Sequence, residues 1–107
     1  MSAFTELYQT VTDRREHPQA GSYTCYLFEK GVDKILKKVG EECAETIIAA
    51  KNGDKDELVL ELADLAFHCA VLMAQAGITP ADVAAELEKR SGKTGNLKTF
   101  HEVDKNT

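Results

Sequence analysis

The sequence has few of the features that mark nucleic-acid-binding, secreted or membrane proteins. Acidic residues outnumber basic ones by 18 to 13, so the net charge is −5 and the pI is about 5.1. A protein whose main task is to hold nucleic acid through a basic face is therefore not expected. No apolar run approaches the roughly 18–20 residues that span a bilayer, and the N-terminal stretch lacks the apolar core of a signal peptide. We therefore expect a cytoplasmic protein without a membrane segment.

Proline, tryptophan and cysteine are also scarce. With two prolines, no tryptophan and a hydrophobic fraction of 43% in 107 residues, the composition favours one compact, mostly helical domain. The cysteines, Cys25, Cys43 and Cys69, are an odd number at wide spacing, and each lies on or beside an apolar helix face. We interpret them as small buried hydrophobic residues of a reducing compartment. The absence of a Cys-x-x-Cys pair argues against zinc bound by Cys43, His68 and Cys69.

Hydrophobic periodicity, capping residues and glycine breaks predict an all-α fold of about five helices. The predicted helices cover residues 4–15, 25–30, 32–52, 56–76 and 80–90. The fourth is apolar on almost every side, which a small monomer cannot bury. We therefore expect an antiparallel helix bundle that is completed by homodimerisation, and the residues leave open whether dimers pair further. Residues 1–90 would form this domain, and the polar residues 91–107 a flexible tail.

The chain is organised around two pairs of acidic residues on the third and fourth predicted helices. The members of each pair are three residues apart: Glu42 with Glu45, and Glu61 with Asp64. At that spacing two carboxylates lie on nearly the same face of a helix. Because the turn between the helices is short, we expect the helices to run antiparallel and the two pairs to meet.

Both acidic pairs face the packing side of their helices. Glu42 lies beside Ile35 and Ala49 at the edge of an apolar stripe, and Glu61 shares its direction with Leu58 and Leu65. The predicted stripe consists of Val32, Leu36, Val39, Cys43, Ile47 and Ala50.

Carboxylates that converge in this way repel each other. The repulsion is about 4 kcal/mol for a pair about 4 Å apart at an effective dielectric constant near 20, so either some are protonated or cations lie between them. Ligand sets made only of oxygen favour Mg²⁺ or Mn²⁺, and a polyphosphate makes two or more ions the expected number. A structural interpretation stays open, because acids at these spacings are also ordinary on solvated helices.

Several basic residues lie close to the acidic pairs or at a helix end. Lys38 and Lys51 flank the acids on the third predicted helix, while Arg14 and Arg15 end the first. They either balance charge at the surface and cap a helix or hold phosphate groups. His68 follows Asp64 on the same side of the fourth helix, and we interpret it as a core histidine that is hydrogen-bonded to a carbonyl or carboxylate.

Two segments closely resemble the phosphoribosyl-ATP pyrophosphatase family: SYTCYLFEKGVDKILKKVGEECAETIIAAKN and ELVLELADLAFHCAVLMAQAGITPADVAAELEKR. That family belongs with the all-α nucleoside triphosphate pyrophosphatases of the MazG type, whose signature is Glu-Glu-x-x-Glu followed by Glu-x-x-Asp. The Ser-Tyr-Thr start, the Lys-Val-Gly-Glu-Glu run and the Ala-Asp-Leu-x-x-His segment single out the narrower family. The resemblance covers about residues 7–90, and Phe67 stands where tyrosine is commoner.

The resemblance implies Mg²⁺-dependent hydrolysis of phosphoribosyl-ATP to phosphoribosyl-AMP and pyrophosphate, the second step of histidine biosynthesis. It also implies that four acids bind the metal and that Glu41 orients or deprotonates the attacking water. The implied metal ligands are Glu42, Glu45, Glu61 and Asp64.

The resemblance further implies that Lys38, Lys51 and Asn52 hold phosphate or ribose, with Arg14 and Arg15 as further candidates. Two alternatives stay open at this point. The same carboxylates would serve a housekeeping nucleoside triphosphate pyrophosphatase of the MazG type. A non-enzymatic helical dimerisation module would need no metal at all.

Overall fold

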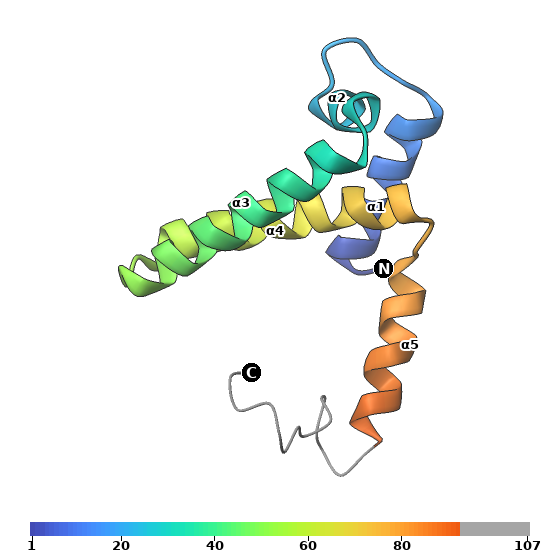
Figure 1. The fold of residues 1–107 in the computed structure, drawn as a ribbon. Coiled ribbons are helices and arrows are strands. Elements are labelled where there is room, and N and C mark those ends of the chain that lie inside the picture. Colours follow the sequence, from blue (N-terminus) through green and yellow to red (C-terminus); the bar gives the residue numbers. More distant parts are fainter. Residues whose placement is uncertain (93–107) are drawn as a thin grey trace.

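The computed structural model describes residues 1–92, and this part of the chain contains five helices and no strand (Figure 1). The helices are α1 (Ala3–Glu16), α2 (Tyr23–Lys30), α3 (Val32–Lys51), α4 (Lys55–Ala76) and α5 (Pro80–Ser91). The all-α prediction with five helices is therefore confirmed. The tail predicted for residues 91–107 lies outside the described residues from 93 onward, and Ser91 is the last residue of α5. Within residues 1–92, no helix combines the length and low polarity that crossing a membrane requires.

Local side chains fix the helix ends. Ser22 caps α2 by accepting a hydrogen bond from the amide of Cys25 at 3.2 Å. Thr79 and Asp82 form a reciprocal capping box at the start of α5, where Pro80 occupies the first turn. Gly77 ends α4 in the left-handed conformation, with φ of 76°, which glycine adopts without steric cost.

Helices α3 and α4 form a long antiparallel hairpin, and the other helices gather at one end of it (Figure 1). The turn between them contains Gly53, whose φ of 71° is again left-handed. Helices α1 and α2 both pack on the hairpin at the end far from this turn, whereas α5 projects away and packs lightly on α1. Among the described residues 1–92, only α3 and α4 therefore hold the turn end of the hairpin.

The hydrophobic core is small and lies where α1, α2, α3 and α4 meet. Its buried members are Val11, Leu27, Ile35, Ala70, Val71 and Ala74. Partly buried residues, mostly aromatic, surround it, and these are Phe4, Leu7, Tyr8, Phe28, Phe67 and Leu72. Helix α5 contributes no buried residue.

The apolar stripe predicted for α3 is not the side that the single chain buries. Helix α3 buries Ile35, Glu42 and Ala49, whereas Leu36 and Ile47 of the stripe are 48% and 67% exposed. The buried residues recur every seven positions, so they form a line along one side of α3. An antiparallel neighbouring helix covers a line of this kind. No other described helix covers the adjacent stripe, so it remains at the surface.

The cysteine prediction is wrong at one position for the same reason. Cys43 is exposed, because it lies on the uncovered stripe of α3. Cys25 and Cys69 are partly buried. All three are free thiols.

The buried line of α3 yields a test of the packing. Ile35 is fully buried in the core, so we expect Ile35→Ala to lower the free energy of unfolding by about 2–5 kcal/mol, as measured by urea denaturation. Lys37→Ala on the exposed side of the same helix should change it by no more than about 0.5 kcal/mol. Equal effects of the two substitutions would contradict this account of the core.

Candidate metal centre

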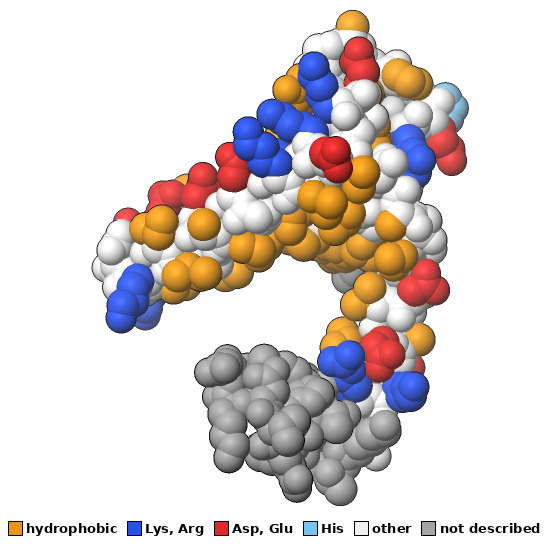
Figure 2. Space-filling model, viewed as in Figure 1, with side chains coloured by type: hydrophobic (Ala, Val, Ile, Leu, Met, Phe, Trp, Pro, Cys, Tyr) orange, Lys and Arg blue, Asp and Glu red, His pale blue; other side chains and the backbone are white. Residues whose placement is uncertain are grey.

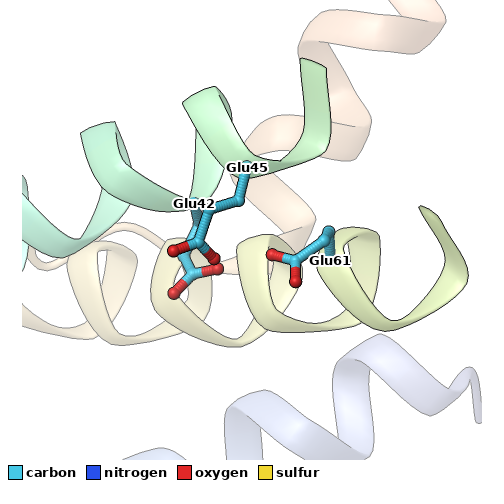
Figure 3. Close-up of side chains that lie close together, drawn as sticks. All are labelled: Glu42, Glu45 and Glu61. Atoms are coloured by element: carbon cyan, nitrogen blue, oxygen red, sulfur yellow. The ribbon is translucent and has the colours of Figure 1, made fainter. Parts of the chain in front are cut away.

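Three carboxylates meet between the two helices of the hairpin. Glu42 and Glu45 extend from α3 and Glu61 from α4, and one oxygen of each lies within 4.8 Å of the others (Figure 3). We call these three residues the acid cluster. Glu42 and Glu61 are buried, at 5% and 9% exposure, and the Oε2 atom of each lacks a hydrogen-bond partner. Buried carboxylate oxygens without partners are costly, and a bound cation would satisfy them.

Protons are shared unequally within the acid cluster. Burial raises the pKa of Glu42, and hydrogen bonding to Glu45 raises it further. Hydrogen bonding to Glu45, followed by burial, raises the pKa of Glu61 to about 8. The pKa of Glu45 is lowered, because Glu61 and Glu42 donate hydrogen bonds to it. Without a cation, Glu61 therefore keeps its proton at neutral pH, whereas the lowered pKa of Glu45 favours its ionised form.

Asp64 lies near the acid cluster without belonging to it. Its side chain is exposed, yet its negative charge contributes to the raised pKa of Glu42. It follows Glu61 by three residues, which is nearly one turn of α4. The structure thus brings together three of the four predicted metal ligands and places the fourth beside them.

Lys38 lies at the rim of the acid cluster. Its Nζ atom is 3.7 Å from Oε1 of Glu41 and 3.8 Å from Oε1 of Glu42. Burial lowers the pKa of Lys38, but the neighbouring Tyr23 and the acids of α3 outweigh burial, so the net shift is upward. Lys38 is therefore a firmly charged cation. Glu41 is half exposed and is held by Lys38 rather than by the cluster.

A hollow of about 400 Å³ opens beside the acid cluster, toward the turn of the hairpin. Its lining residues are Glu45, Ile48, Ala49, Asn52, Asp54, Glu57 and Glu61. Asn52 therefore shares a hollow with two carboxylates of the cluster, Glu45 and Glu61. Lys51 is exposed and does not line this hollow.

Arg14 and Arg15 each contact other residues of the fold. Arg15 donates a hydrogen bond to the carbonyl of Ala74 in α4, and its guanidinium lies 5.4 Å from the ring centre of Phe28. Arg14 pairs with Asp13 at 3.0 Å. The structure gives both arginines partners at the end of α1, and it does not bring them into the acid cluster.

Tyr23 was not among the predicted site residues. Its hydroxyl lies 2.9 Å from Nε2 of His68, whose Nδ1 lies 2.8 Å from the backbone oxygen of Asp64. A carbonyl only accepts, so Nδ1 carries the proton and Nε2 accepts from Tyr23. The interpretation of His68 as a buried histidine bonded to a carbonyl is confirmed. Both residues lie in segments that carry the family resemblance, but no periodicity indicates that residues 45 positions apart meet.

Hard oxygen ligands that converge between two helices, with a cation and an amide at the rim, define a class of all-α hydrolases that act on polyphosphates. A family model described as phosphoribosyl-ATP pyrophosphohydrolase matches residues 4–91. The chain belongs to the phosphoribosyl-ATP pyrophosphohydrolase family, and it is a hydrolase that acts on a phosphoric anhydride. The resemblance noted in the sequence is confirmed, and the non-enzymatic alternative is not supported.

Similar curated proteins agree with this assignment. Two proteins named phosphoribosyl-ATP pyrophosphatase, from Bacillus cereus strains B4264 and G9842, are each 52% identical to this chain over 103 residues. A protein of the same name from Bacillus thuringiensis strain Al Hakam is 48% identical over 103 residues. In each case the match covers 96% of both chains.

The proton held by Glu61 yields a test by pH. In the metal-free protein the unfolded chain releases this proton near pH 4.5, whereas the folded chain holds it up to about pH 8. The folded state binds more protons between these values, so stability should fall as the pH rises from 4.5 to 8. We expect Glu61→Gln, which cannot ionise, to reduce this fall and to be more stable than the original protein above pH 8.

The measurement is urea denaturation in EDTA at several pH values. Glu88→Gln on the exposed side of α5 is the matched control, and it should keep the original pH profile. A Glu61→Gln profile as steep as that of the control would contradict the assignment of the raised pKa to Glu61.

Proposed function

We propose that this protein hydrolyses phosphoribosyl-ATP to phosphoribosyl-AMP and pyrophosphate, the second step of histidine biosynthesis, in the cytoplasm and with Mg²⁺ or Mn²⁺. The observation that carries the proposal is the acid cluster, with its two buried oxygens that lack partners, in a member of this family. The relatives that cover nearly the whole chain bear the name of this activity.

We assign Glu42, Glu45, Glu61 and Asp64 as the metal ligands. Their donors are hard carboxylate oxygens, and no thiol or imidazole nitrogen belongs to the acid cluster, which fits Mg²⁺ or Mn²⁺. When bound, the cation supplies positive charge to the phosphate oxygens and lowers the pKa of water. Binding displaces the proton that Glu61 otherwise keeps at neutral pH.

The residues around the cluster bind and orient the substrate. Lys38 is a charged donor at the rim, and an incoming phosphate oxygen would replace its long contacts with Glu41 and Glu42. Glu41, once released from Lys38, accepts the proton of the attacking water. The amide of Asn52 donates to ribose or phosphate in the neighbouring hollow. Lys51, the preceding residue and exposed, adds positive charge near it. Arg14 and Arg15 approach the phosphates only if they leave their present partners.

The substrate is tested by comparing pyrophosphate release from phosphoribosyl-ATP, ATP and dUTP at equal concentration. We expect clear preference for phosphoribosyl-ATP, and no release with EDTA present. Equal rates on the three substrates would favour a housekeeping nucleoside triphosphate pyrophosphatase of the MazG type.

The metal ligands are tested at Glu45, whose lowered pKa favours its ionised form. We expect Glu45→Gln to weaken Mn²⁺ binding by about 100-fold or more, as measured by calorimetry, and to abolish pyrophosphate release. The original protein should release protons when it binds Mn²⁺ near pH 7, which calorimetry in buffers of different ionisation enthalpy detects. Glu88→Gln should bind and react as the original protein does. Unchanged Mn²⁺ affinity in Glu45→Gln would contradict the ligand set.

We further propose that two copies pair along the hairpin. Apolar side chains follow one edge of the α3–α4 hairpin without interruption and continue toward α5 (Figure 2). The exposed apolar residues of α3 and α4 include Ile47, Ile48, Val59 and Leu60, which are between 57% and 67% exposed. Monomeric proteins seldom expose an apolar patch larger than a few hundred Å². A second hairpin related by a two-fold axis would cover the patch and complete an antiparallel bundle.

The pairing is tested by a charge on the exposed side of α4. We expect the original protein to sediment at twice its chain mass of 11.7 kDa, and Leu60→Asp to sediment as a monomer at micromolar concentration. Gln9→Asp, at an exposed position of α1, is the control and should remain a dimer. A compact monomer of the original protein would defeat this proposal.

A further inference from the structure

Two tyrosine rings and two lysines form an exposed surface on α2 and the start of α3. The rings of Tyr23 and Tyr26 stack with centres 6.1 Å apart and planes 23° from parallel, and both side chains remain about 40% exposed. The Nζ atoms of Lys30 and Lys34 lie 5.8 Å and 5.9 Å from the ring centre of Tyr26. Neither lysine forms an ion pair with a carboxylate of the described residues.

This surface is continuous with the acid cluster. Lys34, Lys38 and Glu42 follow one another at intervals of four residues on α3, so Lys34 lies about 12 Å from Glu42 along the helix axis. The charge of Lys38 acts on both Tyr23 and Glu42. The hydroxyl of Tyr23 reaches His68, on the same helix as Glu61. Basic side chains accordingly gather at the start of α3, and acidic ones follow along the helix (Figure 2).

The surface has the chemistry of a nucleotide subsite. Aromatic faces stack on nucleobases, and lysine ammonium groups bind phosphate as point charges. Phosphoribosyl-ATP carries its triphosphate at one end, a ribosyl phosphate at the other and a flat purine between them. With the triphosphate at the acid cluster, the purine reaches the tyrosines and the second phosphate reaches the lysines.

We propose that Tyr23, Tyr26, Lys30 and Lys34 form a subsite for the base and the ribosyl phosphate that distinguish phosphoribosyl-ATP from ATP. The inference rests on the proposed function, and it assigns substrate selectivity to residues outside the metal centre. The stacked rings hold the purine, and the two lysines select substrates that carry the second phosphate. Tyr23 is positioned for stacking by its hydrogen bond to His68 and by Phe67, whose ring centre is 6.0 Å away.

The first test measures selectivity in the double variant Lys30→Gln/Lys34→Gln. We expect the ratio of kcat/KM for phosphoribosyl-ATP to kcat/KM for ATP to fall by about tenfold or more, because a charge-assisted contact is lost. Lys30→Arg/Lys34→Arg, which keeps the charges, should restore most of the ratio. Lys37→Gln, an exposed position on the same helix, should leave it unchanged.

The second test measures binding without turnover. Calorimetry of the metal-free protein with phosphoribosyl-AMP and with AMP reports the contribution of the ribosyl phosphate directly. We expect the original protein to bind phosphoribosyl-AMP more tightly than AMP, and the double lysine variant to lose this difference. Tyr26→Leu should weaken both nucleotides, because both carry the purine.

The outcomes separate this inference from the proposed function. If the original protein does not prefer phosphoribosyl-ATP over ATP, the proposed function itself fails. If it prefers phosphoribosyl-ATP and the double lysine variant keeps both the kinetic ratio and the binding difference, the subsite is overturned while the proposed function stands.

Discussion

Repulsion among the carboxylates of Glu42, Glu45 and Glu61 is the constraint on which the rest of the structure depends. The hairpin holds one oxygen of each within 4.8 Å of the others, and the side chains of Glu42 and Glu61 are buried. In the absence of a cation, the proton that Glu61 keeps at neutral pH reduces the repulsion, and the lowered pKa of Glu45 favours a negative charge there. A divalent cation relieves it more completely, since it also satisfies the two oxygens that lack partners.

One line of buried residues along α3 contains both packing residues and a carboxylate of the acid cluster. Ile35, Glu42 and Ala49 recur every seven residues and are buried together against α4. The apolar members of this line fix the distance between the helices, and that distance places Glu42 opposite Glu61. The small side chain of Ala49 lines the hollow that opens beside the cluster toward Asn52. The residues that hold the hairpin together therefore also set the geometry of the acid cluster.

Structural features that depend on residues close in sequence could be predicted. Contacts between residues far apart in sequence could not. The caps at Ser22 and Thr79 and the acid pairs on each helix follow from local spacing. The contact of Tyr23 with His68 spans 45 residues, so no local pattern carries it. The apolar stripe of α3 could also be predicted from periodicity, but periodicity does not show whether the same chain or a second copy covers it.

The uncovered stripe and the acid cluster are coupled through the hairpin. The core lies at the end where α1 and α2 pack. Within the described part of the chain, only contacts between α3 and α4 hold the end that contains Glu45 and Glu61. A second copy on the exposed stripe would stiffen that end, and stiffening keeps the three carboxylates close despite their repulsion. Conversely, a cation that binds both helices prevents them from separating, and so it preserves the flat apolar face that a partner covers. Metal binding and dimerisation would therefore strengthen each other, because each would hold the same two helices together.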